Sequence, residues 1–140
     1  MPPAHNRAMD DDPLPRLRAI ALALPDANER LSHGEPTFFA GRSKTFVMYA
    51  NNHHDDGRIA FWCPAPDGFQ RMLVEAEPDR FFVPPYVGFR GWIGVRLDVP
   101  VDWVEIATIV RTAYRMVAPK RLAARLDAGE ADVTTPAPRR

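Results

Sequence analysis

Apolar residues at three- and four-residue spacing predict two helices in the first half of the chain. The first begins after Asp12, carries a stripe of leucines and ends at Pro25. The second begins at Asp67, which forms a capping-box pattern with Gln70, and stops before Pro78. Both helices therefore have a polar start and a proline stop.

The strongest helix signal lies in the last third of the chain. Asp102 and Glu105 form a capping box, and an apolar stripe then continues at three- and four-residue spacing to Val117. We expect this stripe to pack on a sheet, because its members share one helix face. Pro119 interrupts the pattern, and a short terminal helix is predicted over 120–126.

Short apolar and aromatic runs between turn residues predict the strands. Three of them form a meander over residues 37–40, 45–50 and 58–63. Two more, over 80–83 and 92–97, flank a proline-rich turn. The element order is α-β-β-β-α-β-β-α plus a short terminal helix. This order predicts a two-layer α+β fold, with an antiparallel sheet and helices packed on one face.

Length and composition fit one folded unit. The chain has 140 residues, of which 46% are hydrophobic and 26% charged, a balance typical of a soluble globular protein. We expect a single domain over residues 13–126. Residues 1–12 and 127–140 lack an apolar period and are predicted to be flexible tails. A large multidomain enzyme is excluded.

Charge and cysteine content narrow the class of protein. Eighteen Lys and Arg residues balance eighteen Asp and Glu residues. Any surface that binds nucleic acid must therefore come from cations concentrated on one part of the molecule. The single cysteine, Cys63, can form no internal disulfide, which fits a reducing compartment. No apolar run approaches the roughly 18 residues needed to cross a bilayer. We therefore expect a cytoplasmic protein with no membrane partner.

Three segments bear on metals and cofactors. The tract 51–56 holds two histidines and two aspartates, but adjacent extended residues point to opposite sides, which favours a solvated hairpin tip over a metal site. The glycine-containing turns at 41–44 and 88–94 lead into strands, whereas phosphate-binding loops lead into helices. We predict no metal and no cofactor.

His33 and Glu35 flank a glycine and could together form a general base. The serines nearby are candidates for a nucleophile by type only, and Cys63 lies in an apolar strand, where burial raises the pKa of a thiol. Catalysis would need the two side chains to converge in a cleft. A structural turn is the favoured interpretation, so we assign no catalytic residue.

Residues 81–92 interleave aromatic residues with arginine in a proline-stiffened loop, a composition that suits base stacking and phosphate contact. Aromatic residues beside prolines usually pack a loop on the core, which favours burial of Phe81, Phe82 and Trp92. The predicted exposed contacts of this loop are Tyr86, Phe89 and Arg90.

The clearest charge asymmetry lies in residues 111–125, which carry five cations and no acidic residue. Cations near helix ends also complement the helix dipole, so a basic ridge and a merely solvated surface are equally supported. With Arg90 and the hairpin turn at 41–44 as a wing, the ridge defines the predicted nucleic-acid contacts. They are Arg42, Lys44, Arg90, Arg111, Arg115, Lys120, Arg121 and Arg125.

Several segments make the chain similar to the bacterial MmcQ/YjbR-like family, over about residues 14–126. They are HGEPTF at 33–38, KTF at 44–46, PPYVG at 84–88 with GWIGV at 91–95, DW at 102–103, Tyr114 and APK at 118–120. The resemblance implies a two-layer α+β fold related to frataxin-like and secretion-chaperone-like architectures. It also implies DNA binding through a pair of wing-like loops, and it carries over no catalytic residues.

The leading hypothesis is a small non-enzymatic protein that binds DNA weakly through the basic ridge and the wing. The alternative is a protein-interaction adaptor, or a homo-oligomer, that docks through the aromatic loop 81–92. An enzyme that uses His33 and Glu35 is the third hypothesis.

Overall fold

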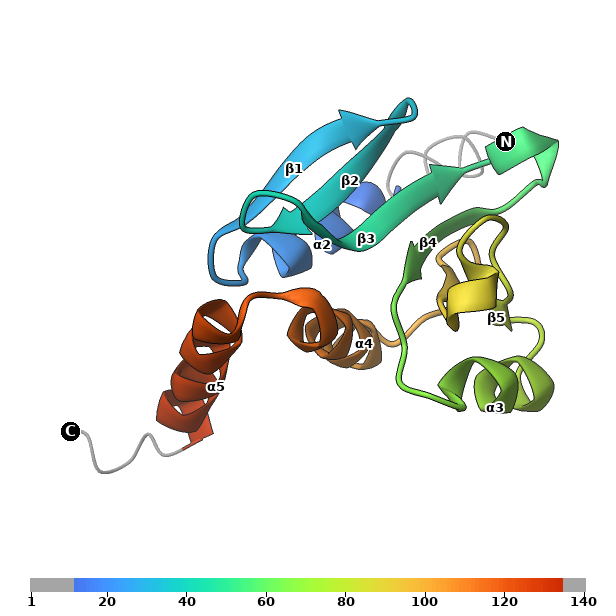
Figure 1. Ribbon diagram of the computed structural model, residues 1–140. Helices are drawn as coiled ribbons and strands as arrows, with labels where there is room; N and C mark the ends of the chain where they lie inside the picture. The colour runs from blue at the N-terminus through green and yellow to red at the C-terminus, as the bar shows by residue number, and fades with distance from the viewer. Residues whose placement is uncertain (1–11, 135–140) are drawn as a thin grey trace, which may run out of the picture.

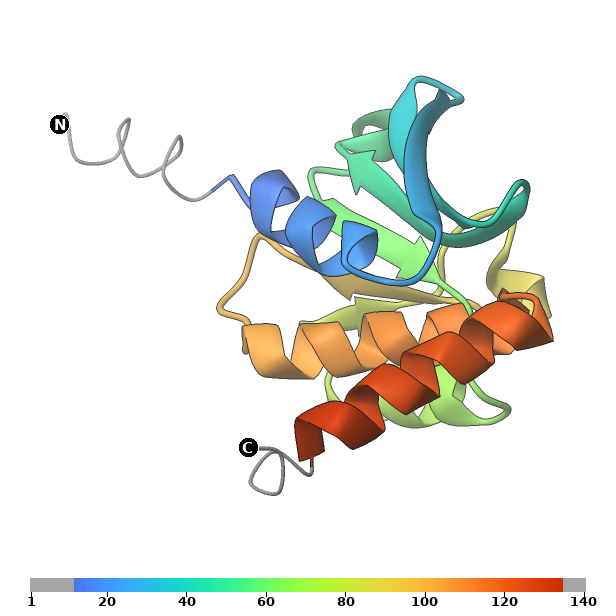
Figure 2. The ribbon, with the colours of Figure 1, turned by 90° about the vertical axis from the view of Figure 1, so that its left-hand side faces the viewer.

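The computed structural model describes residues 12–134, which form a sheet with helices on one face (Figures 1 and 2). The sheet is antiparallel, with strand order β1-β2-β3-β4-β6-β5. The strands are β1 (Ala27–Ser32), β2 (Glu35–Ala40), β3 (Lys44–Asn51), β4 (Ile59–Cys63), β5 (Phe81–Phe82) and β6 (Ile93–Arg96). The helices are α2 (Leu14–Leu22), α3 (Phe69–Ala76), α4 (Trp103–Val117) and α5 (Lys120–Thr134), with 3-10 turns η1 (His53–Asp55) and η2 (Gly88–Arg90). The predicted α+β class is confirmed.

The structure has one strand more than the apolar pattern predicts. Strand β1 is a polar edge strand that pairs with β2 from Ala27 opposite Ala40 to Ser32 opposite Glu35. The two strands join through a two-residue turn in which His33 and Gly34 both have positive φ, the geometry that suits a tight hairpin. Because backbone pairing holds this edge strand in place, its sequence needs no apolar alternation.

Helix α5 is longer than predicted. It runs to Thr134, whereas the sequence pattern placed the helix end at Leu126. Of the two predicted tails, residues 1–11 and 135–140 lie outside the described residues. Asp12, the last residue of the first predicted tail, accepts a hydrogen bond at 3.1 Å from the N–H of Leu14, the first residue of α2.

One of the two predicted capping boxes is wrong, and the other is half formed. Helix α3 begins after Gly68 and has no side-chain cap. The Gln70 side chain instead donates a hydrogen bond to the Gly88 carbonyl. At α4, Asp102 accepts hydrogen bonds from the Val104 and Glu105 N–H groups, as predicted. The Glu105 carboxylate does not return to the Asp102 backbone but instead pairs with Arg80.

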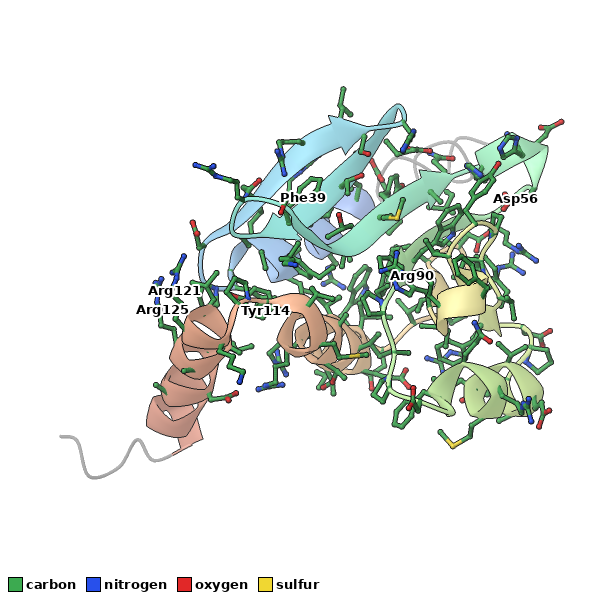
Figure 3. All side chains as sticks on the ribbon, viewed as in Figure 1. Phe39, Asp56, Arg90, Tyr114, Arg121 and Arg125 are labelled. Carbon is green, nitrogen blue, oxygen red and sulfur yellow. The ribbon has the colours of Figure 1, made fainter. Side chains whose placement is uncertain are left out.

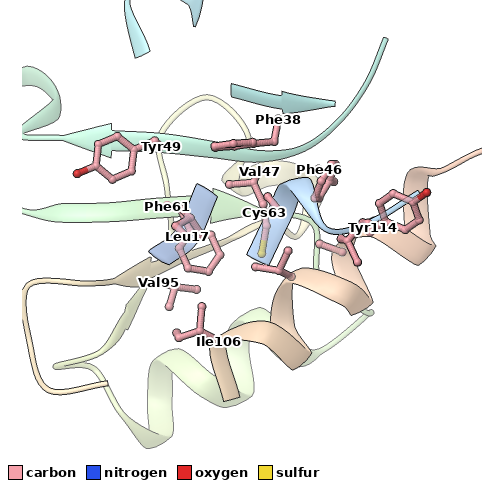
Figure 4. Packing of buried hydrophobic residues seen from close by; sticks show 14 of the residues in the cluster. Leu17, Phe38, Phe46, Val47, Tyr49, Phe61, Cys63, Val95, Ile106 and Tyr114 are labelled. Atoms are coloured by element: carbon pink, nitrogen blue, oxygen red, sulfur yellow. The ribbon is translucent and has the colours of Figure 1, made fainter. Parts of the chain in front are cut away.

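The main core lies between the sheet and helices α2, α4 and α5, and Figure 4 shows part of it. Figure 2 has these three helices in front of the sheet. Phe46 meets Tyr114 edge to face at 5.2 Å, and the Tyr114 hydroxyl donates to the Pro25 carbonyl at 2.5 Å. Cys63 is fully buried here, and burial raises the pKa of its thiol, as predicted.

A smaller apolar cluster lies on the opposite face of the sheet, which we call the outer face. Its buried members are Ala50, Ala60, Trp62, Phe82 and Trp92. Val87 packs against them, so the loop 83–92 folds over this face. Gly94 has to lack a side chain, because an added Cβ would lie 2.4 Å from the Phe82 ring. Phe81, Phe82 and Trp92 are buried, as predicted.

Candidate functional site

A groove of about 520 Å³ opens between the start of β3, the η2 loop and the end of α4. Its volume falls within the roughly 300 to 1,000 Å³ typical of ligand sites. Two cations, Lys44 and Arg90, share this groove, and no acidic residue lines it. The lining residues of this β3–η2 groove are Ser43, Lys44, Thr45, Met48, Val87, Arg90, Trp92, Met116 and Val117.

The turn between β2 and β3 forms one side of the groove, and Gly41 shapes it. Gly41 has a φ of +68°, and its N–H donates to the Asp26 carbonyl at 2.9 Å. A Cβ added at Gly41 would lie 3.6 Å from Leu122 and 4.0 Å from Pro119. The turn therefore packs on the start of α5, and Arg42 projects from this end of the molecule with its side chain exposed.

The loop 83–92 forms the other side, and hydrogen bonds hold it in one conformation. The Gln70 amide donates to the Gly88 carbonyl at 2.8 Å and to the Trp92 carbonyl at 2.6 Å. Gly91 ends η2 in the left-handed region, with a φ of +85°. The Arg90 guanidinium then lies over the Trp92 ring at 5.4 Å, which orients a cation toward the groove.

Two further arginines lie over aromatic rings on the outer face. The Arg30 guanidinium lies 3.8 Å from the centre of the Phe39 ring and donates to the Arg42 carbonyl at 2.7 Å. Arg58 lies 4.0 Å from the centre of the Phe82 ring. Figure 3 labels Phe39 and Arg90, the aromatic ring of one stack and the arginine of another. The outer face thus carries three arginine–aromatic stacks.

Sequence reasoning missed Arg30 and Arg58. Arg30 stands on β1, the strand that the apolar pattern does not reveal. Had β1 been recognised, the alternation of Asn28, Arg30 and Ser32 would have placed all three on one face. Arg58 stacks on a residue that is distant in the chain, and no local signal reveals such a contact.

The tip of the β3–β4 hairpin is tied to the same loop by aromatic contacts. The Tyr86 hydroxyl and His54 Nε2 are 2.8 Å apart, and the centre of the His53 ring lies 5.8 Å from that of the Tyr86 ring. Asn52 and His54 adopt positive φ, which Asn tolerates better than most residues. Within residues 12–134, no group of three His, Cys, Asp or Glu side chains could hold a metal ion.

His33 and Glu35 do not form a cleft. His33 is exposed in the β1–β2 turn, and the Glu35 carboxylate accepts a hydrogen bond from the Asn51 N–H at 3.0 Å. Neither side chain lines the β3–η2 groove. The geometry that general-base catalysis by this pair requires is therefore not present.

Comparison with known proteins places the chain in a family. A family model for YjbR matches residues 22–116. The chain belongs to the YjbR family. The family match spans every residue of the β3–η2 groove except Val117, whereas α5 lies beyond it.

A solved structure of similar fold is the crystal structure of the Deinococcus radiodurans protein DR2400, which contains the family-model domain DUF419. Its TM-score is 0.65 and its sequence identity 18%, over 81% of this chain and 87% of that chain. At this identity the likeness shows the fold that the two proteins share. No curated protein matches the chain. Within the described residues, no helix is long and apolar enough to span a membrane.

The eight predicted nucleic-acid contacts of this YjbR protein do not all lie together. Lys44 and Arg90 line the β3–η2 groove, and Arg42 is on the adjoining turn. Lys120 begins α5, against which that turn packs. Arg111 instead lines a second groove, of about 500 Å³, between α2 and α4. The groove region therefore collects some of the predicted cations and leaves others outside.

The remaining three cations lie along α4 and α5. Arg115 pairs with Asp127 at 2.8 Å. Arg121 and Arg125 act on Tyr114, whose hydroxyl has a raised pKa because burial outweighs the lowering by these two charges. Figure 3 shows Arg121 and Arg125 at the α5 end of the molecule, away from Arg90. Arg111, Arg115 and the pair Arg121 and Arg125 thus have different neighbours.

Proposed function

We propose that this YjbR-family protein binds nucleic acid through the β3–η2 groove, with Lys44, Arg90 and the adjoining Arg42 on phosphates. The observation that carries the proposal is that folding brings Lys44 and Arg90 into one groove whose lining has no acidic residue. Because the formal net charge is zero, a polyanion needs such a local gathering of cations. The proposed location is cytoplasmic, which agrees with the free thiol of Cys63.

The stacked arginines support phosphate binding. A guanidinium held over an aromatic ring loses less side-chain freedom when it binds an anion, and its N–H groups match phosphate geometry. Arg90 over Trp92 and Arg30 over Phe39 are held in this way. With only a few cations in contact, we expect a dissociation constant of about 10⁻⁶ to 10⁻⁴ M at physiological salt.

The proposal is tested by fluorescence anisotropy with labelled DNA over a salt series. Replacing Lys44 and Arg90 together by Gln is expected to weaken binding and to lower the slope of log K against log salt by about 1.4 to 1.8. The charge-matched control replaces Arg16 and Arg111, which line the other groove. An equal loss of affinity in both double variants, or an affinity that does not depend on salt concentration, would contradict the proposal.

A second candidate function is protein docking through the aromatic loop. It is favoured by Tyr86 and Phe89, whose side chains are 66% and 88% exposed. If the partner is a second copy of the chain, light scattering will give a dimer mass that Phe89→Ser reduces to the monomer mass. A monomer at every concentration would exclude this self-association.

A further inference from the structure

Loop 83–92 holds two aromatic rings in solvent without being loose. Phe89 is 88% exposed and Tyr86 66% exposed. The Gly91 N–H donates to the Gly88 carbonyl and the Arg90 N–H to the Val87 carbonyl, both at 3.0 Å. The Gln70 amide and the contact between Tyr86 and His54 fix the two sides of the loop. The exposure of these rings is therefore built into a rigid loop.

The exposed rings belong to the same short segment as the groove residues. Tyr86 directly precedes Val87, and Phe89 directly precedes Arg90, and both Val87 and Arg90 line the β3–η2 groove. Aromatic, apolar and cationic residues thus follow one another along the loop that borders the groove. A ligand that binds along this loop is therefore offered an aromatic ring and a cation at neighbouring positions of the chain.

Duplex DNA matches only the cationic part of this surface. In a duplex, the faces of the bases are stacked on their neighbours, and a protein reaches phosphates, sugars and base edges. The apolar side chains of the groove, among them Met48 and Trp92, have no counterpart on a sugar–phosphate backbone. A single strand offers both phosphates and free base faces, and stacking on an aromatic side chain contributes about 5-fold to 150-fold in affinity per base.

We infer that the groove prefers single-stranded nucleic acid, with unpaired bases stacked on Phe89 and Tyr86 and the adjoining phosphates on Arg90 and Lys44. This inference rests on the proposed function. It adds that Phe89 and Tyr86 select unpaired bases, whereas Lys44 and Arg90 supply affinity for any polyanion.

The experiment compares three labelled DNA probes by fluorescence anisotropy over one common salt series. They are a single strand of about a dozen nucleotides, the same strand annealed to its complement, and a strand of equal length made of abasic sites. The full-length protein is expected to bind the single strand about 5-fold or more tightly than the other two probes.

Phe89→Leu keeps an apolar side chain but removes the aromatic face. It is expected to weaken binding of the single strand about 5-fold or more and to leave the affinity for the abasic and duplex probes unchanged. Leu31→Ala is the matched control, because Leu31 is 75% exposed on β1 and lines neither groove. Circular dichroism checks that both variants keep the fold.

The outcomes separate this inference from the proposed function. Two outcomes overturn the stacking inference. One is that the duplex binds as tightly as the single strand or more tightly. The other is that Phe89→Leu loses as much affinity for the abasic probe as for the single strand. In that case salt-dependent binding that is lost with Lys44 and Arg90 still supports the groove. Salt-independent or absent binding of all three probes overturns the proposed function as well.

Discussion

The outer face of the sheet carries three arginine–aromatic stacks, whereas on the helix-covered face a stack of Arg80 on Phe81 stands beside aromatic rings that pack against each other. Phe46 meets Tyr114 edge to face in the main core. Phe39, Phe82 and Trp92 each have a guanidinium within 3.8 to 5.4 Å of the ring centre. Aromatic residues therefore stabilise the fold on both faces, and on the outer face three of them also orient an arginine.

The two faces also differ in how their polar atoms are satisfied. In the main core, the hydroxyl of the fully buried Tyr114 donates to the Pro25 carbonyl at 2.5 Å. Two buried side-chain nitrogens in the described residues have no hydrogen-bond partner, and they belong to His53 and Trp62, which contact each other on the outer face. Selection for stability alone tends to leave few such groups. The outer face is thus the part of the molecule where we expect function to be found.

The largest effect is expected from breaking the helix-covered face. Phe61 is fully buried in the main core, and Phe61→Ala should lower the free energy of unfolding by about 3 to 5 kcal/mol. Urea denaturation followed by circular dichroism measures this change. A loss below about 1 kcal/mol would show that the core collapses around the cavity, which the close packing there does not predict.

The next largest effect is expected on the outer face, at Gly94. In Gly94→Ala the new methyl group would lie 2.4 to 2.7 Å from Phe82 ring atoms, so the ring must move from beneath Arg58. We expect a loss of about 1 to 3 kcal/mol in urea denaturation and a changed near-UV circular dichroism spectrum. Gly129→Ala, where nothing lies within 4 Å of the added carbon, is the matched control and should not destabilise.

A smaller effect depends on pH and distinguishes a buried phenol from an exposed one. Burial, with the charges of Asp12 and Glu35, raises the pKa of Tyr49 to about 12. The folded state therefore holds the phenol proton more tightly, and this stability is present below pH 10 and lost as the pH rises toward 12. Urea denaturation between pH 9 and about 12 should show a shallower loss in Tyr49→Phe than in the native protein. Parallel losses would contradict the assignment.

The smallest effect is expected at a half-exposed ion pair between α2 and β1. Arg18 and Glu29 form two hydrogen bonds, at 2.7 and 2.9 Å, and hydrogen bonding to Arg18 is the main cause that lowers the pKa of Glu29. The stabilisation is present above the ordinary glutamate pKa and lost as the pH falls through the lowered value. Glu29→Gln should therefore cost less than about 1 kcal/mol at pH 7, and nothing at a pH where Glu29 is protonated.

Parts of the candidate site could be predicted from the sequence. Exposure of Phe89 and Tyr86 beside buried Trp92 follows from aromatic residues that alternate with prolines and arginine in one loop. The stack of Arg30 on Phe39 could not be predicted, because it joins two strands whose pairing is set by the backbone. Gln70 could not be predicted as an anchor either, since its capping-box position concealed a role that depends on residues 18 and 22 positions away.

The sequence by itself determined the α+β class, the helix start at Asp102 and the alternation that builds a buried sheet, because these depend on residues within a few positions of one another. Only the tertiary structure decided that Lys44 and Arg90 share a groove while Arg115 turns to Asp127. Cations distant in the chain come together or part according to how the sheet twists and where helices dock. Those arrangements arise from the packing of the whole core, which no local pattern encodes.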